Sequence, residues 1–323
     1  MNPRHLGILV TVILATGVVT AVATPATGVA RTDLARATIS APISASATGE
    51  SEVAGQLVTV PPGGIIPWHS HPGANFVAVK GGALTVYVGG AEGCTTNTYS
   101  AAQGYLEHVG QVHSAKNEGS APVEAYVTQV GVPVGAELRK TEANPGTANC
   151  PPDATGPAPS VTNIVRAKIS APFEVPSTAT SDVAMQTVVI EPGGTVGWHS
   201  HASPTFVAVK SGALTLYQAT SAGCTSQGYS AGQGYVEPVG AAHMARNEGT
   251  TPVEVYATYL AVPVGGELRA DQQIPGGANC PGATTPQPAS QLPRTGLPAG
   301  LLLTLAAGFA AAGSAARLVA RRR

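Results

Sequence analysis

Apolar and polar positions alternate in short runs along most of this chain. The runs are rich in Val, Leu, Ala and aromatic side chains, and examples are residues 57–60, 76–79, 84–87 and 123–127. Gly or Pro separates them at intervals of roughly ten residues, as tight antiparallel turns require. No segment between residues 36 and 280 shows the period of about 3.6 that a helix needs. Many short strands at even spacing predict an all-β fold, a sandwich or a barrel.

The same pattern occurs twice. Residues 36–150 align without a gap with residues 166–280, and 63 of the 115 positions are identical. The chain is therefore a tandem duplication with a constant offset, and each copy is long enough to bury a core of its own. The domains are predicted at 31–150 and 163–280, joined by a Pro- and Ser-rich linker at 151–162. A Pro- and Thr-rich spacer follows at 281–291.

The N-terminal residues 1–30 have the features of a secretory signal peptide. Arg4 and His5 precede an apolar stretch at residues 6–20, and a small-x-small cleavage site follows at Ala21-Val22-Ala23. A second candidate site is Gly28-Val29-Ala30. An N-terminal membrane anchor is the alternative, although the apolar stretch is short for a bilayer span of about 20 residues.

Residues 292–323 resemble the sorting signal of Gram-positive surface proteins. The pentapeptide Leu292-Pro293-Arg294-Thr295-Gly296 precedes an apolar segment at 297–316 and a terminal run of arginines. The resemblance implies that a sortase cleaves between Thr295 and Gly296 and joins the new carboxyl group to peptidoglycan. The arginines would stay on the cytoplasmic side while the apolar segment spans the membrane transiently. A permanent C-terminal membrane helix is the alternative.

These two signals predict an exported protein on the cell wall of a Gram-positive bacterium, which meets the membrane only through its signal and sorting segments. Processing would remove five of the 17 basic residues and none of the 18 acidic ones, which changes the net charge from −1 to about −6. An acidic mature protein argues against nucleic acid and anionic lipid as partners.

The four cysteines follow the repeat. Cys94 and Cys150 have the same spacing in the sequence as Cys224 and Cys280. Four cysteines allow three pairings, and only Cys94–Cys150 with Cys224–Cys280 gives both copies the same internal crosslink. That pairing is favoured, and an exported protein can keep it oxidised. Metal ligation by cysteine is the alternative, although the chain has no C-x-x-C pair.

Six of the eight histidines form one constellation that is present in both copies. Its members are His69, His71 and His113 in the first copy and His199, His201 and His243 in the second. Residues i and i+2 of a strand share a face, so each H-x-H pair points one way and a later strand can supply the third imidazole. Three imidazoles predict a transition-metal site with open coordination positions. The alternative is that the histidines only hydrogen-bond one another.

The surroundings of these histidines resemble the two sequence motifs of the cupin superfamily. The first motif is present as Gly63, His69, His71, Asn75 and Gly82, and again as Gly193, His199, His201, Thr205 and Gly212. The second is complete as Pro238, Gly240, His243 and Asn247, whereas His108, Gly110, His113 and Asn117 lack the proline. The resemblance covers both copies. It implies two tandem jelly-roll barrels, the arrangement called a bicupin.

One position departs from the family pattern. Asn75 and Thr205 stand where metal-binding cupins place a glutamate ligand, at a possible fourth coordination position. Without a carboxylate a divalent site has a net charge of +2, which favours an anionic ligand or hydroxide and puts oxalate conversion in doubt. Glu107 and Glu237, six residues before the third histidine, are hypothesised to point inward as a fourth ligand or a general base. The alternative is that they face solvent on an edge strand.

Other residues near the motifs are predicted to have structural roles. Trp68 and Trp198 are expected to pack on the barrel exterior, and Tyr105 and Tyr235 in the core or at its rim. His108, present in one copy only, is expected on the surface. The alternation of positions does not decide whether Lys80 and Lys210 face the pocket or solvent.

The predicted function is binding of a divalent transition metal (Zn, Cu, Mn, Ni or Fe) in each barrel, with metal-dependent chemistry on a small molecule through O2 or hydroxide. By affinity order three imidazoles prefer Cu over Zn, and export disfavours Fe(II). The alternative is a non-catalytic module that captures a metal or a small ligand at the cell surface. A passive wall spacer is a third reading.

Overall fold

The computed structural model describes residues 25–151, 153, 156–175, 180–275 and 279–282. The first predicted cleavage site, most of the predicted spacer and the sorting signal with Thr295 and Gly296 lie outside this part of the chain. The described residues form 22 strands and no helix, so none of them belongs to a helix that could span a membrane.

The strands follow the repeat. After the N-terminal β1 (Thr27–Ile39), the first copy contains β2 (Ala45–Ala47), β3 (Ser51–Val60), β4 (Ile65–Ser70), β5 (Ala74–Gly81), β6 (Ala83–Val88), β7 (Thr95–Ser100), β8 (Gln103–Glu107), β9 (His113–Lys116), β10 (Val123–Val132) and β11 (Lys140–Thr141). The second copy contains β12 (Ser160–Ile169), β13 (Phe173–Val175), β14 (Ser181–Thr195), β15 (His199–Ser200), β16 (Thr205–Ser211), β17 (Ala213–Thr220), β18 (Gly223–Ser230), β19 (Gln233–Glu237), β20 (His243–Arg246), β21 (Val253–Val262) and β22 (Ala270–Asp271).

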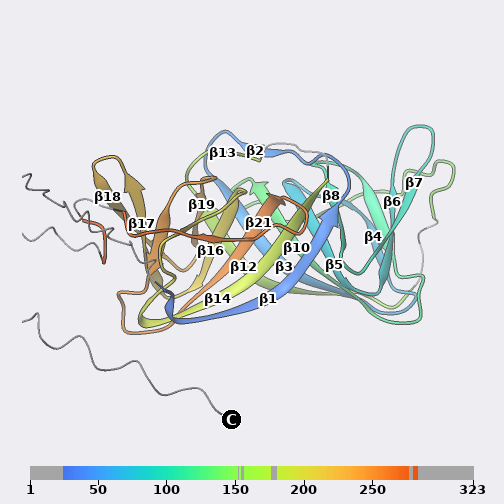
Figure 1. Ribbon diagram of the computed structural model, residues 1–323. Coiled ribbons are helices and arrows are strands. Elements are labelled where there is room, and N and C mark those ends of the chain that lie inside the picture. The colour runs from blue at the N-terminus through green and yellow to red at the C-terminus, as the bar shows by residue number, and fades with distance from the viewer. Residues whose placement is uncertain (1–24, 152, 154–155, 176–179, 276–278, 283–323) are drawn as a thin grey trace, which may run out of the picture. The chain divides into compact units, whose positions relative to one another are not determined.

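Each copy curls into a barrel. In the first copy β8, β5, β10 and β3 form one wall, and β11, β4, β9, β6 and β7 form the other. The second copy repeats these pairings, with β19, β16, β21 and β14 in one wall and β22, β15, β20, β17 and β18 in the other. Figure 1 labels β14, β16, β19 and β21 of the first of these walls and β17 and β18 of the second. Apolar side chains on the inner face of each wall enclose a core, as alternation along half-buried strands requires. The prediction of an all-β fold with two barrels is confirmed.

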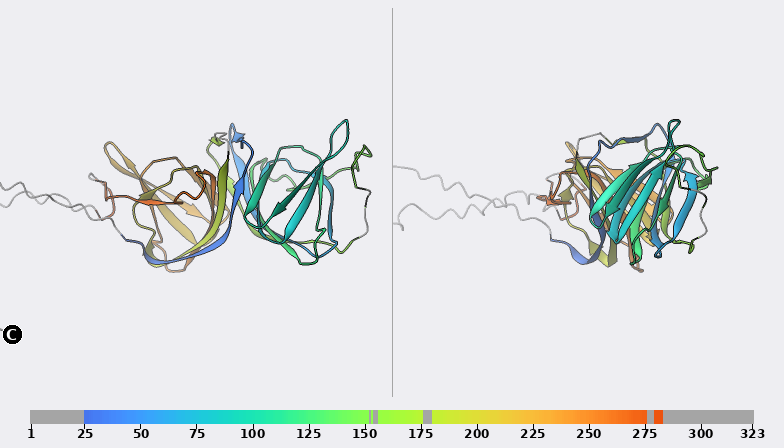
Figure 2. Two further views of the ribbon diagram at one scale, coloured as in Figure 1. Left: turned by 45° about the vertical axis from the view of Figure 1, so that its right-hand side comes forward. Right: turned by 90° about the vertical axis from the view of Figure 1, so that its right-hand side faces the viewer.

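Each barrel is completed by an outer strand that lies, in the sequence, at the start of the other copy. Strand β1 pairs antiparallel with β14 of the second copy over most of its length, and β12 pairs in the same way with β3 of the first. Figure 2 (left) shows β1, in blue, running along the second copy. We therefore call β3–β11 with β12 the first barrel, and β14–β22 with β1 the second barrel; β2 and β13 pair with each other in a separate two-stranded sheet.

This exchange changes the domain boundaries expected from the sequence. Residues 160–162, the end of the predicted linker, belong to β12, and residues 27–30, the end of the predicted signal peptide, belong to β1. Neither copy is a self-contained barrel, because each one borrows a strand. Hydrophobic patterning identifies a strand but not the sheet that it joins, so the sequence alone does not reveal the exchange.

Equivalent ion pairs attach the exchanged strands. Arg36 of β1 donates to the carboxylate of Asp182 over 2.8 Å, and the hydroxyl of Thr38 donates to the same carboxylate over 2.7 Å. At the equivalent positions of the repeat, Arg166 of β12 donates through its Nε to Glu52 over 2.8 Å. Each pair fixes the register of a borrowed strand on its host sheet.

The largest apolar core lies between the two barrels and takes side chains from both copies. Its members include Phe76, Phe173, Phe206 and Tyr256, and the rings of Phe173 and Phe206 meet edge to face with centroids 4.8 Å apart. The Tyr256 ring fills the space beside Gly55, where a Cβ atom would lie 2.7 Å from it. The barrels therefore share one core, so the described parts of the two copies are packed into one compact unit.

The predicted disulfides Cys94–Cys150 and Cys224–Cys280 are both present. Each closes a 56-residue separation, which stabilises the fold by about 4 kcal/mol in the chain-entropy model. Trp198 packs beside Cys280 and donates its indole N–H to the carbonyl oxygen of Pro281 over 3.1 Å. Trp198 is fully buried and Trp68 is 3% exposed, so the chain covers both indoles.

Candidate metal centres

Neighbouring strands bring the three histidines of each barrel together. His69 of β4 lies directly opposite His113 of β9, and His199 of β15 lies opposite His243 of β20. The ring centroids of these two pairs are 4.1 and 4.3 Å apart. All six imidazoles are buried, with at most 7% of any histidine exposed. The H-x-H spacing and the later third histidine thus converge as predicted.

Backbone carbonyl groups fix the tautomer of every one of these imidazoles. Each Nδ1 lies 2.6–2.9 Å from a carbonyl oxygen, contributed by Pro67, Leu138, Gln111, Gly197, Leu268 and Ala241 in the order of the histidines. A carbonyl oxygen can only accept, so Nδ1 carries a proton and Nε2 is the nitrogen available to a metal. In the part of the chain that the structure describes, the buried Nε2 atoms of His113, His201 and His243 form no hydrogen bond of good geometry. This donor set fits a transition metal.

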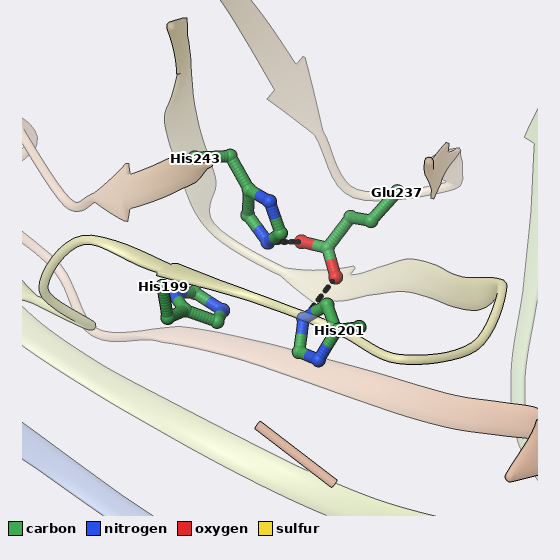
Figure 3. A group of neighbouring side chains, drawn as sticks. All are labelled: His199, His201, Glu237 and His243. Carbon is green, nitrogen blue, oxygen red and sulfur yellow. Dashed lines mark ion pairs between the residues drawn. The ribbon is translucent and has the colours of Figure 1, made fainter. Parts of the chain in front are cut away.

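A buried glutamate faces the histidines in each barrel. In the second barrel the Glu237 carboxylate lies 2.9 Å from Nε2 of His201 and 3.2 Å from Nε2 of His243 (Figure 3). In the first barrel Glu107 lies 3.3 Å from Nε2 of His71 and 3.2 Å from Nε2 of His113. Both carboxylates point inward, and neither faces solvent on an edge strand.

Strand register explains how a carboxylate reaches a site whose motif lacks one. Glu107 lies opposite Asn75 across β8 and β5, and Glu237 lies opposite Thr205 across β19 and β16. The acidic side chain is thus on the strand beside the motif position. In the second barrel Glu237 belongs to the grouping that could hold a metal, so the expectation of a carboxylate-free site does not hold there, whereas the grouping of the first barrel consists of histidines alone.

The two residues expected at the fourth position have other contacts. The side-chain amide of Asn75 donates to the Glu107 carboxylate over 2.9 Å, so it orients the acid. The hydroxyl of Thr205 donates to the carbonyl oxygen of Ser203 over 3.3 Å. The groupings that could hold a metal consist of His199, His201, Glu237 and His243, and of His69, His71 and His113.

Burial and the neighbouring charges set the ionisation of these groups. Desolvation lowers the pKa of His69 and His199 to about 3, so both imidazoles are neutral at ordinary pH. Burial alone would raise the pKa of Glu107, but positive charge on His113 and hydrogen bonds from His113 and His71 outweigh it and hold that pKa well below its usual value. The carboxylate in turn raises the pKa of His113, so a bound metal would take the place of a proton on its Nε2. Glu237 behaves in the same way beside His243 and His201. Both carboxylates are therefore anionic, as metal ligands must be.

A cavity adjoins the histidines in each barrel. Its volume is about 100 Å³ in the first barrel and about 50 Å³ in the second. Tyr105 and Tyr235 line these cavities; Tyr105 stacks on Tyr99, and the ring of Tyr235 lies tilted against that of Tyr229. Burial raises the pKa of both tyrosines well above its usual value, so their phenols stay protonated. Core packing of the two tyrosines agrees with the prediction.

The remaining residues singled out in the sequence lie away from the sites. His108 is exposed, as expected. Lys80 and Lys210 are exposed as well, and Lys210 pairs with Glu254 over 2.9 Å. Sequence reasoning missed Arg139 and Arg269, which line the two cavities. The signal for them was present, because both copies share the run Pro-Val-Gly-x-Glu-Leu-Arg.

Comparison with known proteins finds a domain model that matches one segment of each copy. The model of the cupin domain matches residues 56–129 and 186–259, two segments that occupy equivalent positions of the repeat. No curated protein matches the chain.

Among solved structures, oxalate decarboxylase from Bacillus subtilis at pH 4.6 is 15% identical, covers 74% of this chain and 78% of its own, and has a TM-score of 0.34. A second structure, concerned with the Mn(II) centres of Bacillus subtilis oxalate decarboxylase, has the same identity and TM-score and covers 74% and 80%. The matches to the cupin model, together with the fold, show that this chain contains two tandem cupin domains.

Proposed function

We propose that each barrel binds one divalent transition metal through its three imidazoles and its glutamate, and that the protein is a metal-dependent enzyme acting on a small molecule. One observation carries the proposal. Six of six Nδ1 atoms face carbonyl oxygens, so six Nε2 lone pairs are directed at two points where a buried, ionised carboxylate also lies. Histidines that only supported one another would not need the same tautomer at all six positions.

The residues of each site would hold a metal and leave some of its coordination positions free for a ligand. Three imidazoles and one carboxylate leave two positions open on a six-coordinate ion, next to the cavity. When bound, the ion would supply Lewis acidity to a ligand at these positions. When the glutamate carboxylate is not coordinated to the ion, it would be placed to accept a proton from that ligand. The mixed nitrogen and oxygen donor set suits Zn, Mn, Fe, Ni and Cu, and weakens the preference for Cu that imidazoles alone would have.

Export to the cell wall is part of the proposal. Two disulfides in the barrels are typical of proteins that fold in an oxidising compartment. Strand β1 favours the earlier signal cleavage site, because cleavage after Ala23 leaves β1 whole while cleavage after Ala30 removes its first four residues. Sortase and peptidoglycan are the proposed partners at the C-terminus, through Thr295 and Gly296.

Turnover by the metal-loaded protein tests the enzymatic part. Residues 24–291, which include every described strand, would be loaded separately with Zn, Mn, Cu, Ni and Fe(II). Each sample would be incubated with a panel of small carboxylic acids and phenols. Proton NMR would follow substrate loss, and an oxygen electrode would follow O2. We expect one metal to support turnover that the variant His69→Ala/His199→Ala lacks. Stoichiometric metal binding without turnover of any compound would instead indicate the non-catalytic binding module.

A further inference from the structure

The two cavities share their metal ligands but differ in the arginine at their mouths. In the second barrel the guanidinium of Arg269 forms hydrogen bonds to neighbouring residues of the protein. Its Nε and Nη2 donate to Asp271 over 2.8 and 2.6 Å, and its Nη1 donates to the carbonyl oxygen of Val196 over 2.6 Å. All three nitrogens of that guanidinium therefore have protein partners.

Arg139, the equivalent in the first barrel, is much less engaged. Its Nη2 donates to the carbonyl oxygen of Pro67 over 3.2 Å, and its buried Nε has no hydrogen-bond partner among the described residues. Thr141 stands where the second copy has Asp271, and no carboxylate forms an ion pair with Arg139 in the part of the chain that the structure describes. The guanidinium of Arg139 is half-buried and keeps N–H donors that no carboxylate pairs with. Such a group is suited to bind the carboxylate of a ligand.

The exchanged strands make a second difference. Val161 and Pro159, on and just before β12, line the mouth of the first cavity, whereas Arg31 of β1 takes the position of Val161 at the second. Inside the second barrel, Tyr259 replaces Gln129 and its ring lies 5.3 Å from that of His201. Arg31 and Tyr259 are larger than their counterparts, and the second cavity has about half the volume of the first.

We propose that the first barrel is the ligand-recognising one, and that Arg139 selects small monocarboxylates with an apolar tail. The carboxylate would lie between Arg139 and the metal centre, and the tail would pack against Val58, Ile66, Val77 and Val127. The second barrel, with Arg269 paired and its cavity reduced, binds such ligands weakly. The inference adds a substrate class to the proposed function and rests on it only for the contribution of the metal.

Binding of butyrate and of its neutral amide, butyramide, tests this selection. Both compounds would be titrated into 15N-labelled residues 24–291, once loaded with Zn and once metal-free. The side-chain amide of Asn75 is a reporter for the first cavity alone, since its counterpart is Thr205. We expect butyrate to shift this resonance, and we expect butyramide to bind at least about tenfold more weakly, since it offers the guanidinium no anionic oxygen.

Three variants identify the arginine responsible. Arg139→Gln should lower the affinity for butyrate about tenfold or more without changing the affinity for butyramide. Thr141→Asp should also lower the affinity for butyrate, because it gives Arg139 the same aspartate partner that Arg269 has in Asp271. The matched control Arg269→Gln should leave the Asn75 titration unchanged. Retained metal binding and an unchanged unfolding temperature would show that each variant is folded.

The outcomes separate this inference from the proposed function. If the protein binds no metal but Arg139→Gln still weakens butyrate in the metal-free sample, the inference stands while the metal proposal fails. Equal butyrate affinity of the parent and Arg139→Gln, with metal bound, would overturn the inference and leave the metal centres intact. An equal loss in Arg269→Gln would also overturn it, because the barrels would then not differ.

Discussion

Replacement of both buried carboxylates, Glu107→Gln with Glu237→Gln, is expected to lower the affinity for a divalent transition metal by more than about 100-fold. Residues that only orient a metal ligand contribute about 10–100-fold, and these carboxylates are placed to be ligands themselves. The change removes the anionic oxygen next to Nε2 of His113 and His243 but keeps the shape of the side chain. Competition with a chromophoric chelator measures the affinity of parent and variant for Zn.

A matched control separates ligation from a general effect of charge. Glu118→Gln with Glu248→Gln removes the same two charges at carboxylates that hydrogen-bond Tyr87 and Tyr217 on the surface. This variant should bind Zn as the parent does. If the variant of Glu107 and Glu237 also binds Zn with parental affinity while remaining folded, the carboxylates are not ligands, and a proton-transfer role remains for them.

Separation of the two copies is expected to prevent folding as monomers. A fragment of residues 27–150 carries β1, whose host β14 is absent, and lacks β12, which completes the first barrel. It also exposes the core that the barrels share. Because β1 and β12 are equivalent in the repeat, two such fragments can exchange β1 and rebuild both barrels. Folded material should therefore be dimeric by sedimentation and should dissociate only with loss of the β-sheet circular dichroism.

A second fragment provides the control. Residues 40–172 replace β1 with β12, so the pairing of β12 with β3 is kept on one chain and only the short pairing of β1 with β8 is lost. This fragment is expected to give a larger folded monomeric fraction than residues 27–150 under the same conditions. A folded, monomeric 27–150 fragment with dispersed amide resonances would contradict the exchange of strands.

The repeat made much of this molecule predictable. Alternating apolar positions indicated the strands, and the constant offset between the copies indicated both the disulfides and the six histidines. Two side chains at i and i+2 on a strand necessarily share a face, so His69 and His71 were expected to converge. Each of these predictions depends on local geometry or on comparison of the two copies, and both are available from one sequence.

Other features depend on the pairing of distant strands. The sequence permitted Glu107 to point inward or outward, and only the register of β8 with β5 places it opposite Asn75 and beside His113. In the same way, nothing local to residues 27–39 indicates that they complete the barrel formed mainly by the other copy. The role of Arg139 was missed because it reaches the cavity from a segment after β10, well outside the histidine motifs.

The metal content of the protein tests the central claim most directly, namely that each barrel holds one metal through its three histidines. Residues 24–291, secreted with the disulfides intact, would be analysed by mass spectrometry beside the variant His69→Ala/His199→Ala. We expect about two equivalents of one transition metal in the parent and none in the variant. A parent that contains no metal, even after loading with Zn, Cu and Mn, would contradict the account.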